Sequence, residues 1–130
     1  MMVAQITDNI KIAVEVSFVS EESDWQKQEF LFSYAIAIEN LGQATVQLIS
    51  RHWHIVDASG NKKDIFGEGV VGQQPIIKPK EQYRYTSYCV MKTPIGSMVG
   101  SYLMQPMSDN SKIFSVHIPK FDLVVPIQLN

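Results

Sequence analysis

Residues 30–40 of the chain read Phe30-Leu31-Phe32-Ser33-Tyr34-Ala35-Ile36-Ala37-Ile38-Glu39-Asn40, and they hold the clearest structural pattern in the sequence. A large apolar side chain stands at every even position from Phe30 to Ile38, while the odd positions after Leu31 are small or polar. Successive side chains of a β-strand point to opposite faces of the sheet, so this alternation predicts a strand with one buried face.

The same alternation recurs on both sides of this stretch, between segments rich in turn residues. One such segment, Asn40-Leu41-Gly42, is expected to join its flanking strands into a hairpin, because Asn and Gly tolerate positive φ. The strand expected at 82–91 carries aromatic residues on both faces, which favours a central place in its sheet. Further strands are expected at 10–18, 45–56, 62–66, 98–104, 113–118 and, in the tail, 121–129.

No window of the sequence combines helical spacing of apolar residues with helix caps. Runs of strand length that recur at short intervals are typical of β-sandwiches. We therefore expect an all-β sandwich of about seven to nine antiparallel strands. Residues 1–130 suit a single domain that is large enough to bury a core.

Charge and composition argue against several classes of partner. The 130 residues carry a formal net charge of −2 with scattered lysines and arginines, so no nucleic-acid surface is expected. The single cysteine, Cys89, excludes an internal disulfide and is expected to be a small buried residue. No run approaches the roughly 18 apolar residues of a membrane span, and residues 1–8 lack the features of a signal peptide. A cytoplasmic protein without membrane insertion is expected.

The segment 67–72 has the spacing Gly-x-Gly-x-x-Gly of a dinucleotide-binding loop. In such a site the third glycine opens a helix whose N-terminal amides face the pyrophosphate. Here Pro75 and Pro79 follow, and a helix that started at Gly72 would carry one proline in its first turn and the other in its interior. The segment therefore needs another explanation.

Two interpretations of this loop remain open. In the first, Gly67, Gly69 and Gly72 form a nest of backbone amides that binds a phosphate group, with the Arg51 guanidinium as its cationic partner. In the second, the glycines allow a crossing between sheets or a bulge, and Arg51 packs its stem across one end of the sandwich. The second interpretation is favoured, because isolated glycine motifs are weak signals.

Two histidines are the candidate metal ligands of the sequence. His52 and His54 lie two apart on an expected strand, so they share a face and are weak candidates for a cobalt or zinc site. The spacing offers no third ligand among Asp57, Asp64 and His117, whereas metal sites usually have three or four. No metal and no cofactor are therefore expected. No catalytic residues are expected either, because no nucleophile elbow or carboxylate pair is present.

The two tryptophans are expected in different environments. Trp53 shares one face of its strand with Arg51 and Ile55 and is expected to be buried, with Arg51 near the rim. Trp25 lies in the polar loop 20–28 and has no periodic core partner. It is a candidate contact for a partner protein, or else it folds back over the end of the sandwich.

Five motifs, in order between about residues 14 and 121, resemble those of the bacterial ApaG family. The resemblance implies a fibronectin type III-like sandwich, an association with cobalt resistance and magnesium efflux, and genetic neighbourhood with a diadenosine tetraphosphate hydrolase. Similar domains of eukaryotic F-box proteins and of a DNA polymerase-interacting protein look like binding modules. The motifs are Asn40-Leu41-Gly42, Leu48-Ile49-Ser50-Arg51-His52-Trp53, Asp57-Ala58-Ser59-Gly60, Gly67-Glu68-Gly69-Val70-Val71-Gly72-Gln73-Gln74-Pro75 and Thr93-Pro94-Ile95-Gly96-Ser97-Met98-Val99-Gly100-Ser101-Tyr102.

Two hypotheses about function follow. The leading one is a non-catalytic interaction module for an unknown protein partner, linked only indirectly to cobalt resistance and magnesium efflux. The alternative is a small-molecule binder that takes pyrophosphate, a nucleotide or a divalent metal at the glycine loop. Edges of a sandwich suit the first hypothesis, because an extended peptide can add to them as a strand.

Overall fold

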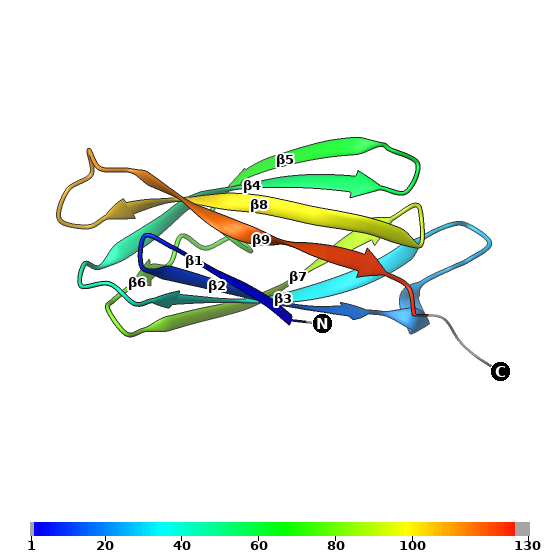
Figure 1. Ribbon diagram of the computed structural model, residues 1–130, viewed down its shortest axis with the longest axis horizontal. Coiled ribbons are helices and arrows are strands. Elements are labelled where there is room, and N and C mark those ends of the chain that lie inside the picture. Colours follow the sequence, from blue (N-terminus) through cyan, green and yellow to red (C-terminus); the bar gives the residue numbers. More distant parts are fainter. Residues whose placement is uncertain (1, 127–130) are drawn as a thin grey trace.

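The computed structural model describes residues 2–126, and nine β-strands in this part of the chain form two layers that pack face to face (Figure 1). Its single helical segment is the short 3-10 turn η1 (Ser20–Glu22), and no helix there is long and apolar enough to cross a bilayer. The strands are β1 (Met2–Thr7), β2 (Ile10–Phe18), β3 (Phe30–Asn40), β4 (Val46–Asp57), β5 (Lys62–Glu68), β6 (Ile76–Ile77), β7 (Gln82–Met91), β8 (Ile95–Pro106) and β9 (Phe114–Val124).

The strands form two antiparallel sheets. The first sheet has the order β1-β2-β3-β7, and the second has the order β5-β4-β8-β9 with β6 paired to the start of β4. Two stacked antiparallel sheets of this kind form an immunoglobulin- or fibronectin type III-like sandwich. The predicted fold class and the predicted number of strands are therefore confirmed.

The core lies between the two sheets and follows the alternation of the sequence. Every even residue of β3 from Phe30 to Ile38 is buried, as the period of two predicts. The opposite sheet contributes the buried side chains Leu48, Trp53, Met98, Tyr102, Met104, Val116, Ile118, Phe121 and Leu123. The core thus lies between β2 and β3 on one side and β4, β8 and β9 on the other.

Strand β7 lies at the edge of its sheet, so its predicted central position was wrong. It pairs with β3 on one side, and within residues 2–126 no strand pairs with its other side. Its inward side chains Tyr83, Tyr85 and Cys89 are only half-buried, and Tyr88 on its outer face is exposed. Aromatic residues on both faces of a strand therefore do not place it in the middle of a sheet when the sandwich is open beside it.

Both ends of the chain also differ from the prediction. Strand β9 runs from Phe114 to Val124, so the strands expected at 113–118 and 121–129 are one strand with a register shift opposite Met98 and Gly100; residues 127–129 lie outside the described part. Strand β1 was not predicted. It forms a hairpin with β2 through Asp8 and Asn9, whose φ angles of 47° and 65° are typical of a two-residue hairpin turn.

Candidate functional site

The inward face of β4 carries Arg51, Trp53 and Ile55, as the alternation predicts. Trp53 is only 2% exposed, which confirms its predicted burial. Its indole packs edge-on against Tyr34 of the opposite sheet and Phe121 of its own sheet, with ring centroids 5.4 and 5.7 Å apart. Trp53 therefore joins the two layers directly beside Arg51.

Arg51 is held by the backbone of the glycine segment. Its Nη1 donates hydrogen bonds to the carbonyl oxygens of Glu68 at 3.1 Å and Gly69 at 2.9 Å. The guanidinium lies flat over Gly67, its partner across the β4–β5 pair, and a Cβ at that position would stand 2.7 Å from the guanidinium carbon. Gly67 is thus the residue that leaves room for the arginine head.

The backbone amides of Gly69 and Val70, and that of Gln73 after the segment, are already paired. The Gly69 amide donates to the Ile49 carbonyl, and Val70 and Gln73 exchange amide-to-carbonyl hydrogen bonds across a tight turn. Gly69 and Gly72 both have positive φ, as either interpretation of the loop requires. The segment therefore presents carbonyl oxygens to Arg51, while the Gly69 amide pairs with β4 and the Val70 and Gln73 amides close the turn.

Gly69→Ala is expected to destabilise the fold more than Gly72→Ala does. Both positions have positive φ, which costs a residue with a Cβ about 1–3 kcal/mol. Only at position 69 would the new Cβ also meet backbone, 2.1 Å from the Gln73 carbonyl oxygen, whereas nothing lies within 4 Å at position 72. Urea denaturation of both variants measures the difference, and equal losses would contradict the close approach at position 69.

The same two variants test phosphate binding at this loop. We expect pyrophosphate to bind no more tightly than the millimolar range, about −4 kcal/mol, because the Gly69, Val70 and Gln73 amides and the Arg51 guanidinium are engaged. Isothermal titration of the unaltered protein decides the question. A micromolar one-site isotherm that Gly69→Ala abolishes would assign an anion site to Gly67, Gly69, Gly72 and Arg51.

The two histidines share the outer face of the second sheet with Asp64. One carboxylate oxygen of Asp64 lies 2.8 Å from His52 Nε2 and 3.1 Å from His54 Nδ1, and these two hydrogen bonds lower the pKa of the Asp64 carboxyl. The His52 ring also stacks on Phe66 at 4.1 Å. Within residues 2–126 no three His, Cys, Asp or Glu side chains are arranged to hold a metal ion. Asp64 is therefore placed as the acceptor for both imidazoles.

A groove that the sequence did not reveal opens on one side of the sandwich, between the edge strands β5 and β7. It has a volume of about 690 Å³. Its floor is formed by Tyr34, Trp53 and Met98 from the core. Its remaining walls come from Arg51, Ile55, Asp57, Asn61, Lys62, Lys63, Ile65, Ser87, Tyr88, Cys89, Val90, Met91 and Lys92. We call this feature the β5–β7 groove.

Cys89 points into the β5–β7 groove and is half-buried rather than fully buried, because β7 is an edge strand. Burial raises the pKa of its thiol, and the nearby Lys63 ammonium opposes this effect. The thiol is therefore mostly protonated at neutral pH and is not an activated nucleophile. As the single cysteine of the chain, it can report on occupation of the groove.

Trp25 lies at the end of the sandwich where the β5–β7 groove ends. Its indole is 62% exposed and packs edge-on against Phe30, with ring centroids 4.8 Å apart. A hollow of about 530 Å³ runs from Trp25 to Asp57, Asn61 and Lys92, which also line the groove. The loop tryptophan is thus both anchored on the core and exposed beside the groove.

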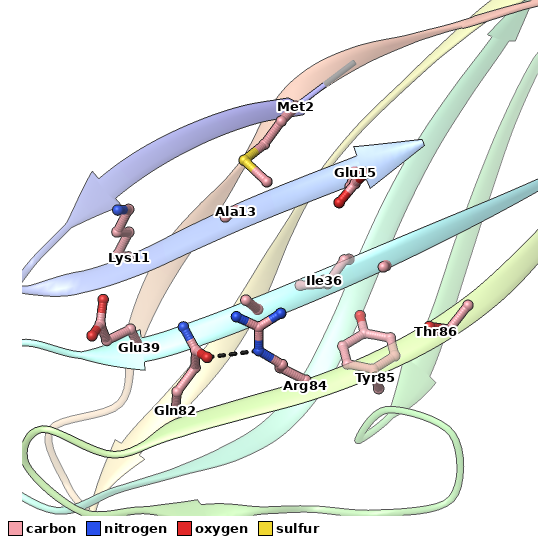
Figure 2. Close-up of a pocket in the computed structure, with 12 residues that line it drawn as sticks. Met2, Lys11, Ala13, Glu15, Ile36, Glu39, Gln82, Arg84, Tyr85 and Thr86 are labelled. Atoms are coloured by element: carbon pink, nitrogen blue, oxygen red, sulfur yellow. Dashed lines mark hydrogen bonds between the residues drawn. The ribbon is translucent and has the colours of Figure 1, made fainter. Parts of the chain in front are cut away.

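A second depression of about 420 Å³ lies on the outer face of the first sheet, and Figure 2 shows its lining. Its floor consists of small side chains, among them Ala13 and Ala37. Its charges balance, because it contains two cationic and two anionic side chains, Lys11, Arg84, Glu15 and Glu39. The Arg84 Nε donates to the Gln82 side-chain oxygen at 2.7 Å (Figure 2). This depression lies on the outer face of a sheet, and its charges show no excess of either sign.

The fold and the groove define the chain as an immunoglobulin-like β-sandwich domain with two free strand edges on its open side. Residues 20–106 match the family described as the ApaG domain, and the chain belongs to this family. Protein ApaG of Anaeromyxobacter dehalogenans (strain 2CP-C) is 46% identical over 129 residues, which is 99% of this chain and 100% of the relative. Protein ApaG of Vibrio cholerae is 45% identical over 121 residues, 93% of this chain and 94% of the relative.

A solved structure agrees with this assignment. The crystal structure described as an ApaA protein from Bordetella pertussis has a TM-score of 0.86 and 39% sequence identity. The match covers 92% of this chain and 95% of that chain. The family resemblance inferred from the five motifs is therefore confirmed.

Proposed function

We propose that the chain works as a single, non-catalytic ApaG-like domain that binds an extended segment of a protein partner in the β5–β7 groove. The observation that carries this proposal is the pair of free edges, since β5 and β7 each pair with a strand on one side only within the described residues. Free edges offer unpaired backbone groups to an added strand, and the groove between them offers pockets for its side chains.

The shape of the groove supports a peptide more than a small molecule. It is bounded along its length by two strands, β5 of seven residues and β7 of ten residues, which matches an extended chain. Its lining carries one carboxylate, that of Asp57, whose oxygens accept from Ser59 and Asn61, whereas a small-molecule site has polar groups that converge on the ligand. Trp25 extends the surface at one end and supplies an exposed aromatic anchor, a residue type enriched where partners bind tightly.

The link to cobalt resistance and magnesium efflux is proposed to be indirect. It rests on the family resemblance, and the domain would act through its partner rather than by binding the ion. We also propose a cytoplasmic location, where the thiol of Cys89 stays reduced.

A photo-crosslinking amino acid tests the location of the partner. Placed at Val90, which lies on β7 and is 57% exposed, it is expected to give discrete adducts in cells that express the protein. At Leu41, an exposed residue in the turn after the far end of β3, the same amino acid serves as the control and is expected to give few adducts. Adding Trp25→Ala to the Val90 variant is expected to reduce its adducts. Equal yields from positions 90 and 41 would contradict binding in the groove.

A further inference from the structure

We propose that the segment bound in the β5–β7 groove is acidic, with carboxylates alternating with apolar side chains along an extended chain. This inference rests on the proposed function and specifies the chemistry of the partner. It is carried by the juxtaposition of three unpaired lysines with an apolar floor between two free strand edges.

The charge of the groove is opposite to that of the whole chain. Four cationic side chains, Arg51, Lys62, Lys63 and Lys92, line it together with one carboxylate, that of Asp57. Four positive charges and one negative charge leave a net charge of +3, whereas the whole chain carries −2. A basic groove on an acidic protein favours the approach of anionic partners and disfavours cationic ones.

The lysines have no charged partner of their own. Lys62, Lys63 and Lys92 are exposed, and none of them forms an ion pair within residues 2–126. The single carboxylate of the groove is occupied, because Asp57 Oδ1 accepts hydrogen bonds from the Ser59 and Asn61 amides. The ammonium groups are therefore free to pair with carboxylates from outside.

Lys63 has the most informative position. It pairs with Ile55 in the register of β4 and β5, so its side chain leaves the inward face of an edge strand, where apolar residues are usual. A charge at such a position disfavours pairing with an apolar strand of any passing protein. The same charge favours pairing with a strand that brings a carboxylate to the Lys63 ammonium group. Lys63 thus selects an acidic strand while it protects the edge from others.

The groove also requires apolar side chains. Ile65 on β5 and Cys89 on β7 are half-buried and face inward, so they offer apolar surface along both edges beside Trp53 and Met98. Tyr88 and Val90 add exposed apolar surface on the outer side of the β7 edge. Successive side chains of an extended peptide point to opposite sides. A segment that alternates acidic and apolar residues can therefore place one set on the floor and the other beside the lysines.

Three fluorescein-labelled octapeptides of alternating sequence test this inference by fluorescence anisotropy. The peptides are four repeats of Val-Glu, of Val-Thr and of Val-Lys, and the protein is the full chain. We expect the Val-Glu peptide to bind at least about tenfold more tightly than the Val-Thr peptide, which is about 1.4 kcal/mol, and the Val-Lys peptide to bind most weakly. The preference for Val-Glu is expected to shrink as ionic strength rises, because the lysines are exposed.

Charge-reversal variants locate the effect. Lys63→Glu and Lys92→Glu are each expected to weaken the Val-Glu peptide at least about tenfold. Lys120→Glu changes the net charge equally on β9, at the far edge of the second sheet, and is expected to leave the affinity within about twofold. Bound Val-Glu peptide is also expected to slow alkylation of Cys89, whose thiol lies in the groove.

The outcomes separate the two proposals. If the Val-Thr peptide binds as tightly as the Val-Glu peptide and protects Cys89, the groove binds extended peptides but the acidic class is wrong. If none of the three peptides binds, the peptide-binding function itself is contradicted. An equal effect of Lys120→Glu, or displacement of the Val-Glu peptide by pyrophosphate at equal concentration, would also overturn the acidic-segment inference.

Discussion

Trp53→Ala is expected to lower the free energy of unfolding by about 3–5 kcal/mol, the range found when a large aromatic side chain is removed from a core. The indole is 2% exposed and fills the space between Tyr34 and Phe121, which belong to different sheets. Neither neighbour can close the gap alone, because each is fixed in its own sheet. Urea denaturation monitored by circular dichroism measures the loss.

Trp25→Ala is the matched control, since it removes the same side chain from a surface loop. Trp25 is 62% exposed and has one aromatic contact, with Phe30, so its loss is expected to cost about 0.5–1.5 kcal/mol. In a Trp25→Phe background, the remaining fluorescence should come from a buried indole. Emission from Trp53 close to that of indole in water, or equal losses for the two alanine variants, would contradict the packing described for Trp53.

The sandwich could be predicted because the period of two is strong wherever one face of a strand is fully buried. Strand β3 is the clearest case, and its even positions from Phe30 to Ile38 are all buried. The turn at 57–61 could also be predicted from its residue types. The Asp57 carboxylate accepts hydrogen bonds from the Ser59 and Asn61 amides, and Gly60 adopts a φ of 83°. In these segments the local residue types and the tertiary packing favour the same backbone conformation.

The alternation of apolar residues gave wrong predictions where a strand is only partly buried. The aromatic residues on both faces of β7 reflect an edge strand with a half-buried inner face and an exposed Tyr88, which alternation alone cannot distinguish from a central strand. In the same way, the break expected between 113–118 and 121–129 is a register shift within β9. A bulge and a turn have similar local sequences, and only the pairing with β8 separates them.

The candidate site was less predictable, because register and not sequence spacing brings its residues together. Arg51 meets Gly67 across the β4–β5 pair, and Lys63 reaches the groove beside Cys89 of the other sheet. The sequence did hold one indication of the groove, the lysine at position 63. Residues 63 and 65 lie on the same face of their strand, and Ile65 packs inward, so Lys63 is a charged residue on the inward face. A charge in an apolar position of a short strand indicates an edge.

The glycine segment and the groove can be understood together. Glu68 and Gly69 supply the carbonyls that hold the Arg51 head, and Gly67 leaves the space in which the head lies. Held there, Arg51 lines the groove beside Trp53 and contributes to its positive charge. In the proposed function, the glycine segment would contribute to binding through the arginine that it positions.

Asn40→Asp is expected to lower the free energy of unfolding by about 2–5 kcal/mol at neutral pH, although the two side chains have nearly the same shape. Asn40 is 1% exposed and is the single buried polar residue in the described core. Its Nδ2 donates to the carbonyl oxygens of Ala44 at 2.8 Å and Ile77 at 3.0 Å, and its Oδ1 accepts from the Gly42 amide at 2.9 Å. A carboxylate keeps the acceptor but turns both donor contacts into repulsion between oxygens.

The effect of Asn40→Asp is also expected to depend on pH. Burial against two carbonyls favours the protonated carboxyl and raises its pKa in the folded state above the unfolded value of about 3.9. The folded variant then binds more protons than the unfolded chain, so its stability falls as pH rises above about 4 and its deficit is smallest in acid. Asn110→Asp, at an exposed position, is the control and is expected to cost less than about 0.5 kcal/mol. Urea denaturation of both variants across pH measures this, and a deficit for Asn40→Asp that does not change between acid and neutral pH would contradict the role of Asn40 as a double donor.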